Sequence, residues 1–145
     1  MPRKIDTNLD NLRHSCAHLL AAAVMELWPK AKRTIGPAIE DGFYYDLDLP
    51  RTLIPEDLAI LEKKMKKIVG QAQPFSGTHV STQEAKVRLK KINQPYKVEL
   101  VEDLEKEGEK EVSFYANTLN DKVMFVDLCR GGHLDHTGQV GAFKL

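Results

Sequence analysis

The longest run of helical periodicity lies near the start of the chain. Pro29 ends it. Along one face the apolar side chains recur at spacings of three and four residues, and they are Leu9, Leu12, Cys16, Leu19, Leu20, Ala23, Val24 and Leu27. At 100° per residue, His14 and His18 lie nearly opposite this stripe, beside Ala21 and Met25. Because both faces are apolar, we expect a helix over residues 8–28, buried on both sides, with its histidines lining a pocket.

Two further patterns follow this helix. Alternating side chains over residues 34–48 predict a β-hairpin with its turn at residues 40–42, and they send Phe43 and Tyr45 to the same face. Pro55, followed by two acidic residues, predicts the start of a second helix, which Gly70 ends.

The rest of the chain alternates short strand and helix signals. Residues 74–80 predict a strand, and the capping box that opens at Ser81 predicts a helix to about Lys91. Alternation predicts a strand over residues 96–101, followed by a charged loop to residue 111. Residues 112–116 and 123–128 predict a strand pair joined by turn residues 117–121. We therefore expect one α+β domain over residues 1–145, in which helices pack a mostly antiparallel sheet.

Composition limits the kinds of function. The 145 residues are 42% hydrophobic and 29% charged, which is ordinary for a globular protein. The 21 basic and 21 acidic residues balance, which argues against holding nucleic acid by bulk electrostatics but allows recognition of a nucleic-acid end. No apolar run approaches the roughly 20 residues that span a bilayer, and the first residues lack a signal peptide's apolar core. We expect a cytoplasmic protein that contacts no membrane.

The candidate chemistry lies in two segments far apart in the sequence. His14 and His18 are four residues apart, so a helix presents both imidazoles on one face. Cys129 and His133 repeat the offset around two glycines, which favours a loop. Our central hypothesis is that these four side chains converge on one metal ion or one activated water.

The two cysteines differ in local character and do not suggest a disulfide. Cys16 falls on the apolar stripe, and we interpret it as a core residue. We interpret Cys129 as a ligand or pocket residue. The alternative for Cys129 is a catalytic thiolate whose pKa the neighbouring Arg130 lowers.

Five segments, in order, resemble the editing domain of bacterial-type threonyl-tRNA synthetases. They are residues 13–20, 35–37, 42–46, 127–133 and 141–145. The resemblance runs from about residue 9 to the last residue. The related editing domain of alanyl-tRNA synthetase and its free-standing relatives share the two histidine-bearing motifs, but they are not expected to carry the segment at 42–46. The resemblance therefore favours the threonyl member.

The resemblance implies a hydrolase that removes serine wrongly attached to threonine tRNA. Its expected partners are the 3′-terminal aminoacyl-adenosine of that tRNA and the rest of a synthetase chain. The expected catalytic residues are His14, His18, Lys97, Asp127, Cys129 and His133. Tyr45 matches a pocket tyrosine, and we expect Ala17 and Met25 of the first helix to form further pocket walls.

The implied hydrolysis requires only a few chemical groups from the protein. Serine and threonine differ by one methyl group, worth only about 1–3 kcal/mol of discrimination, so a second site must remove serine by size. Cutting the ester needs a positioned water, a base and oxyanion stabilisation. We expect His14 or His18 to position or deprotonate the water, Lys97 to stabilise negative charge or hold the terminal ribose, and Asp127 to bind the α-amino group.

A metal is the main alternative within this reading. The ligand types suit tetrahedral zinc, and the alanyl relatives are expected to bind it there. The threonyl family is expected to work without an essential metal. We predict that no cofactor is required; a bound zinc ion would be held by His14, His18, Cys129 and His133.

Two departures keep alternatives open. The family usually has proline where this chain has Gly132, which resembles the alanyl form. The family also continues past Leu145 into the rest of the editing domain, an aminoacylation domain and an anticodon-binding domain, so we expect a chain cut short at its C-terminus. The alternatives are an alanyl-type deacylase acting in trans and a non-catalytic module that binds zinc or a tRNA end.

Overall fold

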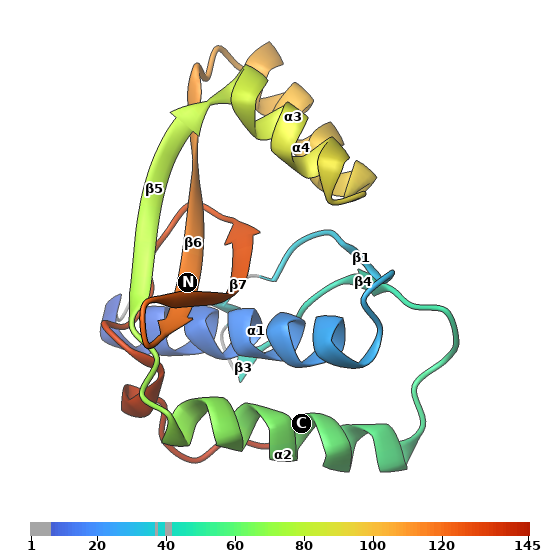
Figure 1. Cartoon of the computed structure of the whole chain (residues 1–145), viewed down its shortest axis with the longest axis vertical. Coiled ribbons are helices and arrows are strands. Elements are labelled where there is room, and N and C mark those ends of the chain that lie inside the picture. Colours follow the sequence, from blue (N-terminus) through green and yellow to red (C-terminus); the bar gives the residue numbers. More distant parts are fainter. Residues whose placement is uncertain (1–6, 37, 40–41) are drawn as a thin grey trace, which may run out of the picture.

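The computed structural model describes residues 7–36, 38–39 and 42–145. Helices α1 (Thr7–Leu27) and α2 (Pro55–Gly70) lie one above the other at one end of the molecule. A three-stranded antiparallel sheet rises from α1, in the order β5 (Phe75–Ser81), β6 (Glu111–Leu119) and β7 (Lys122–Leu128). Helices α3 (Thr82–Lys91) and α4 (Pro95–Lys106) pack at its far end (Figure 1). The predicted α+β class with antiparallel sheets is confirmed.

Helix α1 is the central element of the lower half. Nine consecutive or nearly consecutive residues are buried around its whole circumference, namely residues 15–19 and 21–24. Leu19 and Ala23 belong to the hydrophobic cluster shared with Leu61 and Met65 of α2. The opposite face, which carries His18, meets the sheet at Asn117 of β6. The prediction of a helix buried on both sides is confirmed, with bounds shifted by one residue.

The predicted hairpin exists as two short antiparallel ladders. Strand β1 (Lys32–Arg33) pairs with β4 (Leu47–Asp48), and β2 (Ala38–Ile39) pairs with β3 (Gly42–Phe43). The predicted turn includes residues 40 and 41, which lie outside the described residues. Between the ladders the ring of Tyr45 packs on the backbone of Gly36, where any Cβ would collide with it. The hairpin therefore fixes the position of Tyr45.

The strand predicted at residues 96–101 is wrong, because these residues form part of α4. Val98 and Val101 of α4 are buried in a second hydrophobic cluster, and Leu104 packs against it. This spacing of three residues is helical, and Pro95 occupies a first-turn position where its missing N–H costs nothing. Residues 96–101 also alternate between polar and apolar side chains, as a strand would. Only the longer segment through Leu104 shows that the period is helical. The charged loop predicted from residue 102 accordingly begins only after Lys106.

Strand β6 is longer than predicted, and the turn after it is shorter. The connection to β7 is Asn120 and Asp121, with φ of 52° and 63°. Two left-handed residues between paired strands are typical of a type I′ hairpin turn. Asn117, predicted in the turn, instead lies inside β6 with its side chain fully buried.

The other predicted elements are confirmed within a residue or two. Ser81 caps α3, with its Oγ accepting a hydrogen bond from the Glu84 N–H at 3.1 Å. After β7 the chain crosses beneath α1 through the short 3-10 helix η1 (Thr137–Gln139), and its last residues pack on α2, where the Leu145 N–H donates to Glu62 at 2.7 Å. None of the helices in the described ranges has the length and apolarity needed to cross a membrane.

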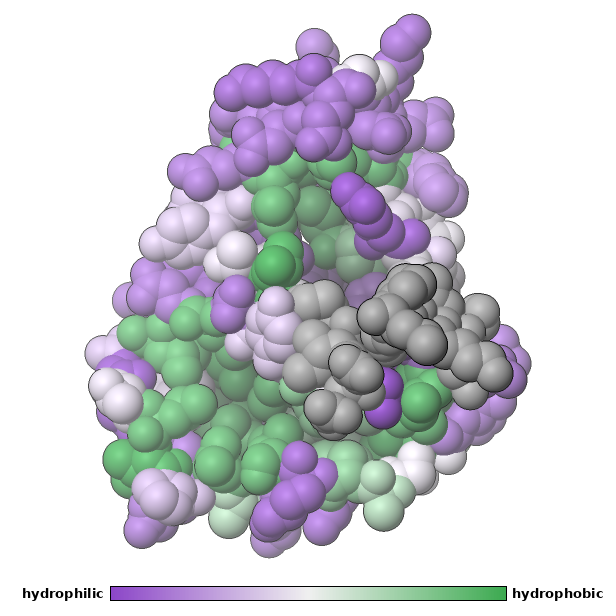
Figure 2. Space-filling view, turned by 180° about the vertical axis from the view of Figure 1, so that it is seen from behind, coloured by the Kyte–Doolittle hydropathy of each residue, from purple (hydrophilic) through white to green (hydrophobic). Residues whose placement is uncertain are grey.

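The two ends of the molecule present different surfaces. Seen from behind, hydrophilic side chains cover the end formed by α3 and α4, whereas hydrophobic side chains gather over the lower half (Figure 2). The site described next lies between these ends, where β6 and β7 meet α1.

Candidate active site

The two predicted histidine segments meet in space. The ring of His133 stacks on the ring of His14, with centroids 4.2 Å apart, and stands edge-on to His18 at 5.1 Å. Phe75 covers the His133 ring at 4.8 Å. The Cys129 Sγ lies 3.3 Å from His133 Nε2. Three imidazoles and one thiol thus form a single cluster between α1 and the segment after β7.

The segment after β7 is shaped by two glycines and one serine. Gly131 and Gly132 have φ of +94° and +82°, a region that side chains rarely adopt and that the ring of proline forbids. Ser15 of α1 anchors the returning chain, because its Oγ accepts a hydrogen bond from the Leu134 N–H at 3.0 Å and lies 3.1 Å from His133 Nδ1. The glycine at position 132 is therefore required by the backbone path that brings His133 to α1.

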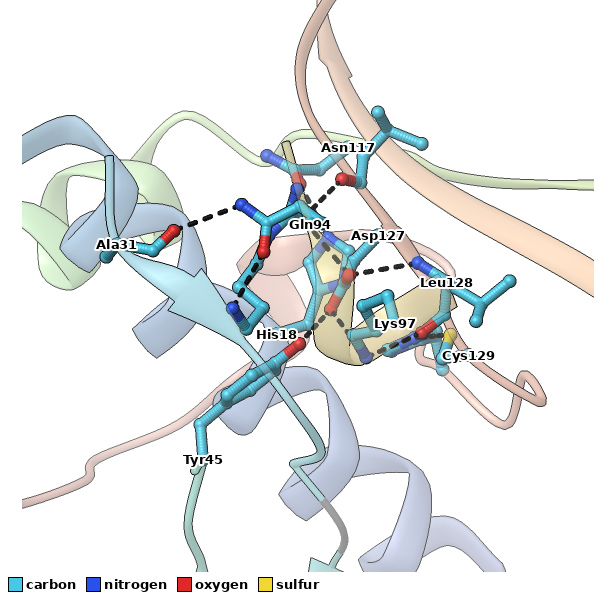
Figure 3. A network of polar contacts seen from close by, with 12 residues as sticks. His18, Ala31, Tyr45, Gln94, Lys97, Asn117, Asp127, Leu128 and Cys129 are labelled. Atoms are coloured by element: carbon cyan, nitrogen blue, oxygen red, sulfur yellow. Dashed lines mark hydrogen bonds and ion pairs between the residues drawn. The ribbon is translucent and has the colours of Figure 1, made fainter. Parts of the chain in front are cut away.

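Beside the histidines, Asp127 is the centre of a buried polar network (Figure 3). Its Oδ1 accepts a hydrogen bond from Arg33 Nη1 at 3.0 Å, and its Oδ2 accepts one from the Tyr45 hydroxyl. Lys97 Nζ lies 3.5 Å from Oδ2 and donates to the Leu128 carbonyl at 3.1 Å. One carboxylate therefore holds three side chains, which come from β1, from the strand-to-strand connection at Tyr45 and from α4.

Burial decides the charge states of this site. Desolvation is the largest influence on all three histidines, and it lowers the pKa of His14, of His18 (to about 4) and of His133. The imidazoles are therefore neutral near pH 7 and can accept a proton. Desolvation also lowers the pKa of Lys97, against the opposing attraction of Asp127.

Burial at Cys129 disfavours the alternative of a reactive thiolate. Burial raises the pKa of the Cys129 thiol to about 12. Arg130, expected to lower that pKa, is exposed to solvent. A raised pKa favours the protonated thiol at neutral pH, which is consistent with the predicted role of Cys129 as a pocket or ligand residue. Cys16 is buried in the core, as predicted.

Two neighbouring cavities, which share lining residues, open beside these groups. The smaller has a volume of about 20 Å³ and is lined by His14, His18, Gly36, Tyr45, Lys97, Asp127, Leu128 and Cys129. A cavity needs roughly 10–15 Å³ to hold a water, so this one has room for about one water molecule. The larger, of about 1120 Å³, shares His14, Lys97 and Cys129 with it and runs out between α4 and the segment after β7.

Three donors could hold a metal ion. The ligand atoms of His14, Cys129 and His133 lie within 4.8 Å of one another. Tetrahedral zinc with bonds of about 2.0–2.3 Å places its donors roughly 3.5 Å apart, so small side-chain shifts would bring these three to ligand geometry. His18, expected as a fourth ligand, is outside this group, and its Nε2 lies 2.8 Å from Asn117 Oδ1. If zinc binds, His14, Cys129 and His133 would hold it and leave one position open.

Two expected pocket walls lie elsewhere. Ala17 is completely buried within α1, and Met25 packs against the cluster shared with α2; neither lines either cavity. Met25 shares the face of His18 but lies seven residues further on, about 10 Å along the axis at 1.5 Å per residue. Tyr45 is the expected wall residue that lines the small cavity.

The sequence analysis missed two buried polar residues. Arg33 is 4% exposed and pairs with Asp127, and Asn117 is completely buried against His18. Arg33 looked like a surface residue beside Lys32. Every second side chain of a strand points to the same face, so Ser113 and Asn117 share a face. Extending the predicted strand to residue 117 would therefore have placed Asn117 on the face of the site.

The chain is similar in sequence to known proteins over nearly its whole length. A family model described as the threonyl and alanyl tRNA synthetase second additional domain matches residues 109–145. Threonine–tRNA ligase of Bdellovibrio bacteriovorus is 44% identical over 142 residues, and that of Dehalococcoides mccartyi is 47% identical over 139, covering 98% and 96% of this chain and 21% and 22% of those proteins. That of Mycobacterium tuberculosis is 47% identical, covering 92% of this chain and 20% of its own length.

The chain therefore spans about a fifth of the length of the curated relatives it matches. The match covers 98% of this chain, so it contains both histidine segments and the whole Asp127 network. Residues 109–145 are similar to the second additional domain of the threonyl and alanyl tRNA synthetases, and nearly all of the chain is similar to one segment of threonine–tRNA ligases.

Proposed function

We propose that this chain is an aminoacyl-tRNA deacylase that hydrolyses serine mischarged onto threonine tRNA. Its substrate is the 3′-terminal aminoacyl-adenosine of that tRNA, and its other partner is the rest of a synthetase chain. These partners belong to the cytoplasm. In the reaction the water oxygen bonds to the ester carbon, the bond to the ribose oxygen breaks, and that oxygen takes up a proton.

The observation that carries this proposal is the water-sized cavity. Its volume of about 20 Å³ suits one water, and its lining combines neutral imidazoles, an ammonium group and a hydroxyl. Neutral His14 and His18 offer proton acceptors, which a hydrolytic water needs. Lys97 supplies the charge that stabilises a developing oxyanion. Base, water space and oxyanion stabiliser lie around one cavity.

The contacts of Asp127 favour an anchoring role for it. Its two oxygens already receive hydrogen bonds from Arg33, Tyr45 and the Leu128 N–H, and they lie beside Lys97. A carboxylate has about four acceptor positions, so little capacity is left for a substrate ammonium group. We therefore propose that Asp127 chiefly orients Lys97 and Tyr45, and that binding of the α-amino group would require displacing the 3.5 Å contact with Lys97.

The larger groove is suited to the terminal nucleoside. At about 1120 Å³ it is slightly larger than the roughly 300–1,000 Å³ of typical small-ligand sites, and it shares His14, Lys97 and Cys129 with the small cavity. Its outer lining is acidic, with Asp103, Glu107, Glu109 and Glu111. Those carboxylates would repel phosphates, so we propose that the groove takes the uncharged end of the substrate and that the rest of a synthetase holds the tRNA body.

Discrimination by size requires walls that do not yield. The Tyr45 ring packs against the Gly36 backbone while its hydroxyl is fixed on Asp127. A wall held at both ends cannot move aside for a methyl group without breaking a buried hydrogen bond. We propose that this rigid wall favours serine over threonine.

The test is deacylation of purified seryl-tRNA and threonyl-tRNA, both made on threonine tRNA, by this chain alone. The proposal predicts release of serine at a rate at least tenfold above that of threonine. Lys97→Ala should abolish the release, whereas Lys63→Ala, an exposed lysine on α2, should leave it unchanged. Equal rates for both substrates, or full activity in Lys97→Ala, would contradict the proposal.

Two other functions are outcomes of the same test. The backbone at Gly132 excludes the proline that the threonyl family usually has there, and this departure resembles the alanyl form. Faster clearance of seryl-tRNA made on alanine tRNA would support an alanyl-type deacylase. The three metal donors support a zinc module. Stoichiometric zinc that is needed for folding, without any deacylation, would establish that function instead.

A further inference from the structure

The strongest unassigned contact in the site joins His18 to β6. His18 is 3% exposed, and its Nε2 lies 2.8 Å from the Oδ1 of Asn117, whose side chain is completely buried. A short contact between two buried groups fixes which atom carries the hydrogen. The protonation pattern of His18 therefore depends on which way the Asn117 amide points.

A chain of side-chain amides sets that direction. Asn117 Nδ2 donates to Gln73 Oε1 at 2.6 Å, and Gln73 Nε2 donates to Gln71 Oε1 at 2.7 Å. The backbone of Gln73 is held in turn, because its N–H donates to Thr137 Oγ1 at 2.8 Å. With its Nδ2 engaged by Gln73, Asn117 presents its carbonyl oxygen to His18. An oxygen can only accept, so Nε2 of His18 carries the hydrogen.

The other ring nitrogen is then left for the cavity. His18 is buried and its Nε2–H donates to an amide oxygen rather than to a carboxylate, so the ring keeps a lone pair on Nδ1. His18 lines the water-sized cavity. His14 has the opposite arrangement: its Nδ1 lies 3.3 Å from the Gly132 carbonyl, so Nδ1 carries the hydrogen and Nε2 the lone pair.

We propose that Asn117 is a positioning residue that holds His18 as its Nε2–H tautomer, so that Nδ1 accepts a hydrogen bond from the hydrolytic water. The catalytic role of this tautomer rests on the proposed deacylase function, whereas the assignment of the tautomer itself does not. The amide chain extends the site from the cavity, through Gln73, to the end of α2. Catalysis thereby depends on residues that touch no substrate.

The direct test is the 15N spectrum of the imidazoles in the 145-residue chain labelled at its five histidines. Protonated and unprotonated ring nitrogens have well-separated 15N shifts, and His18 is assigned from the signal lost in His18→Gln. We expect a protonated Nε2 and an unprotonated Nδ1 in His18, with the reverse in His14. An unprotonated Nε2 in His18 would overturn the inference whatever the activity.

Amino-acid substitutions test whether the His18 tautomer controls the rate of serine release. Asn117→Leu, similar in size, removes the acceptor, and we expect mixed His18 tautomers with kcat of serine release about 10- to 100-fold lower and KM within twofold. Gln73→Glu keeps an acceptor for Asn117 Nδ2, so the Nε2–H tautomer should persist. Gln83→Ala, an exposed amide on α3, is the control for amide loss.

The outcomes separate this inference from the proposed function. An Nε2–H His18 in a chain without deacylase activity would refute the function and leave the structural assignment intact. An active chain in which Asn117→Leu keeps both tautomer and kcat would refute the positioning role alone. If Asn117→Leu does not fold, the wild-type spectrum still decides the tautomer. The kcat measurement then uses Gln73→Leu, which frees the Asn117 amide to rotate.

Discussion

The two faces of the β6–β7 hairpin differ in character: one is apolar and packs in the core, and the other carries the polar residues of the site. On one face Phe114 pairs with Leu128, and both are buried in the hydrophobic cluster with α3 and α4. On the other face Tyr115 pairs with Asp127, and Asn117 points to His18 of α1. Alternation along a strand sends neighbours to opposite sides, so the core pair Phe114–Leu128 lies next to the site pair Tyr115–Asp127.

This difference shows how the site is kept rigid. The apolar face is stabilised by burial, which is non-directional and tolerates small shifts. The polar face depends on hydrogen bonds and ion pairs that fail together when one partner is removed. Because both faces share one backbone, packing on α3 and α4 fixes the positions of the polar groups opposite. The following predictions test that division.

The largest effect is expected on the polar face, from Asp127→Ala. It leaves Arg33 and Lys97 buried without their carboxylate, and removing one member of a buried ion pair costs about 3–5 kcal/mol. We expect the free energy of unfolding to fall by that amount and serine release to be lost. Urea unfolding measures the first and a deacylation assay the second; the control, Asp103→Ala in the exposed end of α4, should change stability by less than about 0.5 kcal/mol.

On the apolar face, Phe114→Ala should cost about 3 kcal/mol by leaving a cavity against α3 and α4. Its deacylation rate per folded molecule should stay within about twofold of wild type, because the side chain points away from the site. A variant with near-normal stability but lost activity would contradict the division of roles between the two faces.

An effect of comparable size, spread over more than two pH units, is expected from acid. The pKa of His18 falls from 6.5 to about 4 on folding, so between those values the unfolded chain binds more protons than the folded one. Stability therefore falls as pH drops from about 6.5 toward 4, by about 1.4 kcal/mol per pH unit for this histidine. Unfolding at several pH values should show this slope, and His18→Gln should remove its share. A slope unchanged in His18→Gln would mean that other groups cause it.

The smallest expected effect is that of metal removal. We predict that a chelator leaves the deacylation rate and the melting temperature of chain purified without a histidine tag unchanged. Loss of activity on chelation and recovery with zinc would instead assign His14, Cys129 and His133 to a required metal centre.

Sequence reasoning succeeded where a pattern extends over many residues. The helix of His14 and His18 was predicted from both of its faces, because a 21-residue element gives the period many repeats. It failed for the short segment that became α4, where six residues fit two periods and Lys97 was assigned to a strand. In the structure Lys97 lies on the buried face of that helix with Val101, four residues further on.

The partners of the site residues were beyond the sequence patterns. Arg33 and Asn117 act through contacts 94 and 99 residues away along the chain, which local periodicity does not contain. Asn117 also has a strong preference for turns, and its buried place in β6 overrides that preference because His18 and Gln73 satisfy its amide. The candidate site residues had a motif in the sequence, whereas the residues that contact them had at most the alternation of a strand.

The most direct measurement of the whole account compares serine release with threonine release from threonine tRNA by wild type and by His14→Ala. The account predicts rapid loss of serine, slow loss of threonine, and a fall of at least tenfold in the serine rate when the imidazole is removed. Release of both amino acids at one rate, or serine release that survives the substitution, would contradict it.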